Sequence, residues 1–206
     1  MMVKLKSFTP ISGAAGLGFA ILIALANAIA VPAGLPTPGT AFRDAAAFFA
    51  GGSTALDIAT ALGPLTWTLA TIFAAGAVVT LWRSELARGW ALVGLSGLLL
   101  QNGAFTVVIA LRLALASAPP TEGLWALHET VFTLNGTFLA IAMLGLSLGG
   151  LRAGLIRPWH AGLGLVSAAL MFTSATLSLA LPGLFGWLLW VVWIGAYGVV
   201  LIRADR

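Results

Sequence analysis

The sequence predicts an all-α, polytopic membrane protein with six transmembrane helices and both termini in the cytoplasm. Of the 206 residues, 60% are hydrophobic and only 8% are charged. About a quarter of the residues of a soluble domain are charged, so the deficit indicates lipid as the surrounding solvent. Long apolar runs alternate with short segments that hold most of the charges, and the basic residues gather on one side if every run crosses the membrane.

Six runs reach the roughly 20 mostly apolar residues that a transmembrane helix needs. The first follows a basic MMVKLKSF start like that of a signal sequence. It is long enough to span, and no small-residue cleavage site precedes a soluble domain, so we expect an uncleaved helix. The runs form a single transmembrane domain, residues 1–206, with spans at 11–31, 56–82, 89–117, 124–149, 159–180 and 184–203.

The basic residues determine the expected orientation. Loops rich in lysine and arginine stay in the cytoplasm, and an even number of spans keeps most of these residues on one side. We therefore expect a multi-pass protein of the bacterial cytoplasmic (inner) membrane. The residues on the predicted cytoplasmic side are Lys4, Lys6, Arg83, Arg88, Arg152, Arg157, Arg203 and Arg206.

Residues 32–55 form the one long connection and lie on the predicted outer side. Thr40 is placed to cap a short amphipathic helix. We expect this helix to lie in the membrane interface, either as a simple connector or as a lid. Its apolar face holds Phe42, Phe48 and Phe49, and its polar face holds Arg43 and Asp44.

Composition excludes several kinds of site and partner. The chain has no cysteine, so disulfides, thiolate metal sites and cysteine nucleophiles are excluded. Two histidines are too few for a multi-histidine metal centre, and we expect no metal and no cofactor. The ten basic residues are too few and too closely tied to helix ends to form a nucleic-acid surface.

Arg112 and Glu129 are the ionisable residues that bear most on function, because charged groups inside a span are costly and usually functional. Each lies five residues from the outer end of its predicted span, which places both ~7 Å below the outer boundary at the helical rise. Because the two spans are consecutive and antiparallel, the equal depth predicts an Arg112–Glu129 ion pair. That pair either belongs to a binding site or pins the hairpin structurally.

Other polar and aromatic residues gather in the outer half of the predicted bundle. They either line a cavity that opens outward or serve as hydrogen-bonding contacts between helices. Three tryptophan and phenylalanine side chains would hold the apolar body of a ligand. The predicted ligand-binding residues are Arg112, Glu129, His128, Gln101, Asn102, Asn135, Thr133, Trp67, Phe105 and Trp193.

Asp57 and Glu129 are the carboxylates that an enzyme could use as acids. Asp57 also fits a structural function, because Thr54-x-x-Asp57 resembles the start of a helix whose first amides a carboxylate would cap. An arginine next to Glu129 would stabilise the charged carboxylate, which favours binding over proton donation.

Two patterns leave alternatives open. Arg83-x-x-Leu86-x-Arg88-x-Trp90 recurs 69 residues later as Arg152-x-x-Leu155-x-Arg157-x-Trp159. This indicates either a duplicated helical hairpin or convergence on the usual interfacial anchors. The spans also carry Gly94-x-x-Gly97, Gly145-x-x-x-Gly149 and Gly162-x-Gly164. These glycines permit close helix contact, either within the chain or in a homo-oligomer.

The layout resembles the bacterial six-helix family called domain of unknown function 4386. The resemblance rests on the outer loop with its short helix, the histidine-bearing start of the fourth span, and one turn. That turn runs from Ala153-Gly154-Leu155-Ile156-Arg157-Pro158-Trp159 into Gly162-Leu163-Gly164. It implies a membrane protein without an established activity. A looser similarity to integral membrane terpenoid cyclases would make Glu129 and Asp57 the acids.

These observations favour a protein that binds a small amphiphilic or isoprenoid-like molecule in an outer-half pocket within the lipid bilayer. Arg112 and Glu129 would orient its polar end. One alternative is a membrane-embedded, acid-catalysed cyclase or isomerase of the terpenoid type, with Glu129 as the acid. Another is a structural subunit of a membrane complex, joined through the glycine-rich helix faces.

Overall fold

The fold was determined as a computed structural model, which describes residues 8–204; Lys4, Lys6 and Arg206 lie outside this range. The described chain is mainly helical and has no strand among residues 8–204, and six of its segments are long and apolar enough to cross a membrane. Their bounds agree with the predicted spans to within a few residues, which confirms the all-α, six-span fold class. The helices are α1 (Phe8–Ala30), α2 (Phe42–Ala50), α3 (Thr54–Ala61), α4 (Gly63–Leu81), α5 (Glu85–Ser117), α6 (Glu122–Arg152), α7 (Pro158–Leu177) and α8 (Ala180–Arg203).

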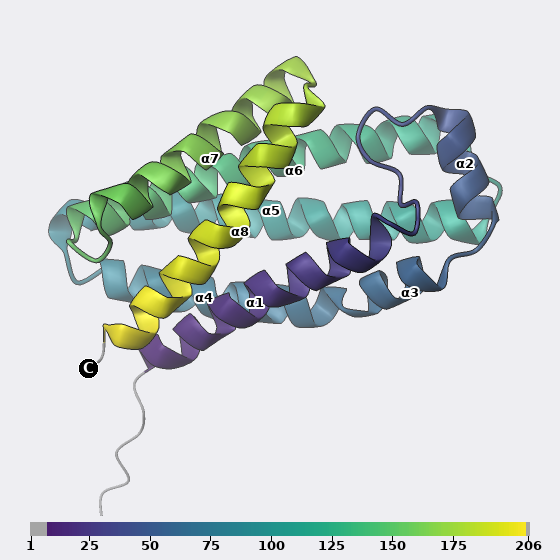
Figure 1. The fold of residues 1–206 in the computed structure, drawn as a ribbon. Helices are drawn as coiled ribbons and strands as arrows, with labels where there is room; N and C mark the ends of the chain where they lie inside the picture. Colours follow the sequence, from purple (N-terminus) through teal and green to yellow (C-terminus); the bar gives the residue numbers. More distant parts are fainter. Residues whose placement is uncertain (1–7, 205–206) are drawn as a thin grey trace, which may run out of the picture.

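The six spans pack in a ring. Each span contacts the next along the chain, and α8 closes the ring by packing against α1 (Figure 1). The main core lies inside this ring, where Phe73, Met143, Ile194 and Tyr197 are fully buried. We call the end of the ring that carries Arg83, Arg88, Arg152 and Arg157 the arginine end.

The α5–α6 hairpin is longer than the rest of the ring. Helices α5 and α6 have 33 and 31 residues, whereas α7 and α8 have 20 and 24. At the helical rise, the first two are about 50 and 46 Å long, well beyond the roughly 30 Å hydrocarbon thickness of a bilayer. Their far ends extend past the α7–α8 turn toward α2 and α3 (Figure 1).

Helices α2 and α3 and the far ends of α5 and α6 form a second, smaller unit that we call the cap. It has its own apolar core, separate from that of the ring, which consists of Ala45, Phe49, Leu56, Leu115 and Trp125. In α2, Phe49 is buried, Phe42 and Phe48 are partly buried, and Arg43 and Asp44 are exposed. The short helix thus covers the hairpin end with its aromatic face.

Two capping predictions were wrong. Helix α2 has Ala41 at its N-cap without a side-chain hydrogen bond, because the Thr40 hydroxyl instead donates to the carbonyl of Thr37 at 2.7 Å. Helix α3 is capped by Ser53, whose side chain accepts from the amide of Leu56. Asp57 lies one turn later and is exposed, so it contributes at most a favourable charge near the helix start.

The predicted second span consists of two helices, with α3 ending at Ala61 and α4 beginning at Gly63. Pro64 explains this division, because proline has no amide hydrogen and its ring clashes with the carbonyl four residues earlier. It occupies the first turn of α4, where a missing donor is tolerated. The break is a single residue, Leu62, whose backbone keeps a right-handed helical conformation.

Helices α5 and α6 approach most closely near the arginine end. A Cβ atom added at Gly97 would overlap the backbone of Ala142, and one added at Gly145 would overlap the backbone of Gly94. Small residues permit this approach, since lipid supplies no hydrophobic force between helices and association depends on close packing. These glycines are therefore used within the chain.

The two copies of the Arg–Trp motif occupy different structural positions. Arg83 follows the end of α4, whereas Arg152 is the last residue of α6. Trp90 lies inside α5 and is partly buried, whereas Trp159 is the second residue of α7 and is 62% exposed. The corresponding residues do not share a local structure, which favours convergence over duplication.

Candidate functional site

The partner of Arg112 is His128. Arg112 Nε donates to His128 Nε2 at 3.2 Å across the α5–α6 interface, and no Arg112–Glu129 ion pair forms among the described residues. The direct ion pair predicted from equal depth was therefore wrong. Arg112 and Glu129 do lie at similar levels of the hairpin, but one residue along a helix rotates a side chain by about 100°. That rotation turns His128 toward α5 and Glu129 toward the outer loop.

Glu129 is held by the loop that precedes α2. The backbone amide of Gly39 donates to Glu129 Oε2 at 2.8 Å. The other carboxylate oxygen, Oε1, lies 3.6 Å from His128 Nδ1. Gly39, Glu129, His128 and Arg112 thus form one continuous row from the loop into the hairpin, which we call the polar row.

The contacts of His128 assign its tautomer. Its Nε2 accepts from the permanently charged Arg112, so the ring proton belongs on Nδ1. Nδ1 then faces Glu129 Oε1, although the 3.6 Å separation is longer than a hydrogen bond. Both atoms are buried and make no hydrogen bond with the described residues. Hydrogen bonds therefore join the residues at each end of the row, whereas no hydrogen bond joins Glu129 to His128 in the middle.

Aromatic rings enclose the polar row. Trp125 stacks on His128 with 4.8 Å between ring centroids, and the Arg112 guanidinium lies 5.9 Å from the ring centroid of Phe132. Trp125 Nε1 also donates to the carbonyl of Thr40 at 3.2 Å, which fastens the loop a second time. His128 is only 2% exposed and Arg112 only 9%. The rings thus bury Arg112 and His128, whereas the Glu129 side chain beneath the loop keeps 25% of its surface exposed.

Arg112 keeps unused donors. Its only hydrogen bond to the described residues comes from Nε, whereas a guanidinium carries five N–H groups in a planar fork. The four N–H groups on its terminal nitrogens remain for a carbonyl, carboxylate or phosphate oxygen. Among the described residues, no group of three or more histidine, cysteine, aspartate or glutamate side chains is placed to hold a metal ion.

Nearer the arginine end, a hydrogen bond joins the same two helices. Gln101 Nε2 donates to Asn135 Oδ1 at 3.2 Å, and both side chains are buried. The hydroxyl of Thr133 donates to the Glu129 carbonyl, so its hydrogen bond stays within α6. Asn102 and Phe105 are half-buried. This part of the interface forms an extension of the polar row.

Trp193 lies away from the polar row. It is packed against His160 and Tyr197, with ring centroids 6.1 and 5.2 Å away, and its carbonyl accepts from His160 Nε2 at 3.0 Å. Helix α8 packs against α1 and α7 in the ring. The structure therefore does not bring Trp193 together with Arg112. Asp57, exposed on α3, also makes no hydrogen bond or ion pair with the site.

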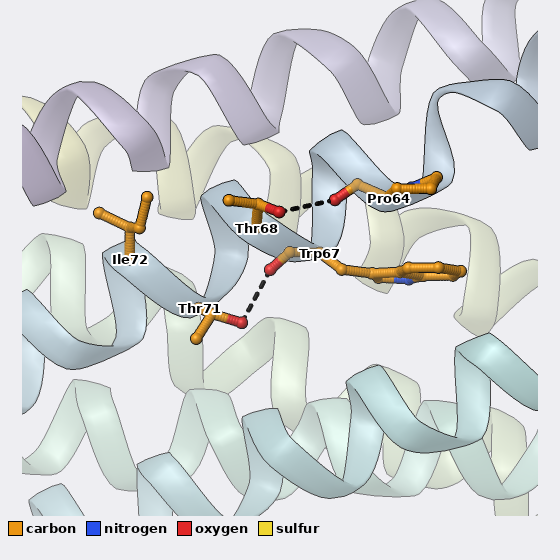
Figure 2. Close-up of a pocket in the computed structure, with 5 residues that line it drawn as sticks. All are labelled: Pro64, Trp67, Thr68, Thr71 and Ile72. Atoms are coloured by element: carbon orange, nitrogen blue, oxygen red, sulfur yellow. Dashed lines mark hydrogen bonds between the residues drawn. The ribbon is translucent and has the colours of Figure 1, made fainter.

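Trp67 lines a shallow groove on α4. Figure 2 shows its indole extending below Pro64, and Thr68, Thr71 and Ile72 line the same groove. The hydroxyls of Thr68 and Thr71 donate to carbonyls of their own helix. The indole Nε1 is buried without a hydrogen-bond partner. None of the residues that line this groove belongs to the polar row.

The distance along the hairpin locates the site. At the arginine end, the Arg152 guanidinium lies 5.2 Å from the Trp90 ring centroid, which aligns the two helices there. Arg112 is 22 residues beyond Trp90, and Glu129 is 23 residues from Arg152. These separations correspond to about 33 and 35 Å of helix. The polar row thus lies about one hydrocarbon thickness from the Trp90–Arg152 contact.

Several residues of the site were not predicted. Gly39 and Thr40 contact α6 through backbone atoms, and no side-chain pattern in the sequence signals such contacts. Trp125 and Phe132 could have been found, because they lie three residues before and four residues after His128 on one helix face.

Comparisons with known proteins add nothing to this description, because no protein-family model, curated protein or solved structure matches the chain.

Proposed function

We propose that this protein binds a small amphiphilic, isoprenoid-like molecule whose polar head occupies the polar row beneath the loop before α2. The observation that carries the proposal is that buried Arg112 and His128 lie in one row with Glu129, which a loop from a distant part of the chain holds. Burying such groups costs free energy, and ionisable groups in membrane spans are usually functional. A fold that only needed a stable hairpin could use apolar residues here.

The groups of the polar row favour a head with hydrogen-bond acceptors and at least one donor. The free N–H groups of Arg112 suit carbonyl, carboxylate or phosphate oxygens. Glu129 suits a hydroxyl or amine donor, which would replace the Gly39 amide when the loop moves. The loop is thus the lid of the proposed site, and the amphiphile enters when that lid opens.

The position of the row along the hairpin supports this reading. Trp and Arg residues anchor helices at a membrane boundary, and Trp90 and Arg152 provide such an anchor. Arg112 and Glu129 would then reach the opposite boundary, where the head of an amphiphile resides and its chain extends into lipid. This replaces the earlier expectation of a site ~7 Å below the surface.

The cyclase alternative has less support from these contacts. A carboxyl that donates a proton needs a protonated oxygen directed at the substrate. Glu129 instead accepts from the Gly39 amide and faces His128 Nδ1. The other proposed acid, Asp57, is exposed and lies outside the polar row.

The test is mass spectrometry of what copurifies with the intact protein in mild detergent. We expect a bound amphiphile whose amount falls about tenfold in Arg112→Gln, the worth of one charge-assisted hydrogen bond. The matched control is Arg43→Gln, which alters an exposed arginine of the cap outside the row. Equal amounts in both variants, or no bound amphiphile in the unmodified protein, would contradict the proposal.

The proposal includes both termini in the cytoplasm of a bacterium and α2 at the outer membrane surface. Cysteines introduced at Ser84 and Ala153, both near the arginine end, should resist an impermeant thiol reagent in intact cells. A cysteine at Thr121, in the α5–α6 turn, should react. Labelling at Ser84 would refute the orientation without affecting the binding proposal.

A further inference from the structure

We infer that the arginine end of α4 holds an anionic diacyl phospholipid, with its phosphate at Arg83 and one acyl chain along the exposed face of α4. The inference is independent of the polar row, which lies at the other end of the bundle. It rests on a groove of about 410 Å³ lined by Val78, Val79, Trp82 and Arg83.

The groove has an apolar wall and one charged end, which matches the acyl chain and head group of a lipid at a membrane boundary. Val79 is 51% exposed and Trp82 is 44% exposed, so an apolar wall remains uncovered by the chain. Arg83 stands at the polar end of this wall. Tryptophan and arginine are the residues that flank membrane spans at the head-group level, and here they are consecutive residues directly after the end of α4.

Arg83 has its full set of donors free, whereas Arg88, the other arginine of the same turn, already uses part of its guanidinium within the turn. Arg88 Nε donates to the carbonyl of Trp82 at 3.1 Å and Arg88 Nη1 lies 3.7 Å from Glu85. Among the described residues, Arg83 makes no hydrogen bond or ion pair. A guanidinium with a full set of free donors favours a bidentate phosphate, and the one acidic residue of the turn already faces Arg88.

The same face of α4 provides room for a chain. Pro64 and Trp82 are 18 residues apart, which is about five full turns, so they point the same way. The groove around Trp67 (Figure 2) and the groove at Arg83 therefore lie along one face of α4. From Pro64 to Trp82 that face is about 27 Å long, which is enough for one acyl chain that starts at Arg83.

Native mass spectrometry of the intact protein, titrated with phosphatidylglycerol or with phosphatidylcholine, tests the inference. We expect a one-to-one phosphatidylglycerol adduct that survives at concentrations where the phosphatidylcholine adduct is lost. Arg83→Gln should reduce the phosphatidylglycerol adduct by about threefold to tenfold, since one charge-assisted contact near water is lost. Val79→Trp should reduce both lipid adducts, because it fills the apolar wall and leaves Arg83 in place.

The matched control is Arg157→Gln, which removes an exposed arginine at the same end of the bundle that lines neither groove. It should leave the adduct unchanged. Equal losses in Arg83→Gln and Arg157→Gln would mean that only net charge matters, and would overturn the site. So would equal retention of the two lipids, or a protein dimer that forms through α4 and excludes the lipid.

Discussion

The two halves of the α5–α6 hairpin are built on different principles. Near the arginine end, Gly94, Gly97 and Gly145 bring the two backbones into direct contact. Near the cap, the same helices meet through Gln101–Asn135 and Arg112–His128 hydrogen bonds. The first half lies within the ring of spans, where lipid gives no hydrophobic drive and close packing provides association. The second half projects beyond the ring and carries its own cover.

This difference explains the extra helices. A hairpin end that projects from the ring needs burial of its own, and α2 and α3 provide it through the apolar core of the cap. Within that enclosure hydrogen bonds join Gly39 to Glu129 and Arg112 to His128, although His128 Nδ1 and Glu129 Oε1 stay without one. One half of the hairpin is therefore held by direct backbone contact, and the other by hydrogen bonds between side chains.

The largest expected effect concerns the stable half. In Gly145→Leu the new side chain would meet the backbone of Gly94 and the carbonyl of Trp90, which cannot move without separating the helices. We expect a loss of more than about 3 kcal/mol of unfolding free energy, at the upper end of overpacking costs, measured by thermal unfolding in detergent. Gly103→Leu on α5 is the control, because nothing lies within 4 Å of the added Cβ. Similar melting of the two variants would show that the backbones are not in contact.

The next effect concerns the polar row. Arg112→Leu and His128→Leu should each cost about 2 kcal/mol, because each removes a hydrogen bond to a charged group and strands its partner. The double variant should recover about 1–2 kcal/mol of the summed loss. The matched cycle pairs Arg112→Leu with Glu129→Leu and should show weaker coupling, since His128 lies between the two groups. If Arg112 were coupled more strongly to Glu129 than to His128, the result would support the direct ion pair instead.

A smaller effect concerns the lid. Trp125→Phe keeps the ring against His128 but removes the donor to the Thr40 carbonyl. We expect a loss of about 1 kcal/mol in the closed state of the loop. Amide hydrogen exchange in residues 37–50 should accelerate about fivefold, since local opening governs exchange there. Trp159→Phe, at the other end of the molecule, is the control and should leave this exchange unchanged. Unchanged exchange in both variants would mean that the indole does not hold the lid.

The sequence predicted the spans well because apolar length is a local property. Each run is long enough to be recognised alone, and six of them are found as helices. It could not predict how far α5 and α6 project, because their far ends remain apolar enough to continue the predicted spans. The prediction that Arg112 lies inside the membrane depended on treating each helix end as a membrane boundary.

The candidate site was partly predictable for a similar reason. Helical periodicity places Gln101, Phe105, Val108 and Arg112 on one face. Of these, Phe105 is half-buried and the other three are buried. Choosing His128 over Glu129 as the partner of Arg112 requires the rotation of α6 about its axis, which the packing of Gly145 on Gly94 sets many turns away. The Gly39–Glu129 contact joins residues 90 positions apart, and a backbone donor leaves no trace in the sequence.

The smallest expected effect lies where the two halves of the hairpin meet. Gln101 Nε2 donates to Asn135 Oδ1, but Gln101 Oε1 is buried without a partner. The bond gained is therefore offset by an acceptor left unsatisfied, and hydrogen bonds between membrane helices average only about 0.6 kcal/mol. Gln101→Leu alone should cost about 0.5–1 kcal/mol, because it strands the Asn135 amide. The double change Gln101→Leu with Asn135→Leu removes both groups, so its stability in detergent should return to within about 0.5 kcal/mol of the unmodified protein or exceed it.

A double variant less stable than either single variant would mean that these amides hold the hairpin together, and that the polar half also serves stability. If stability is recovered and the copurified amphiphile decreases, the same pair of residues extends the binding surface of the polar row toward the glycine contact.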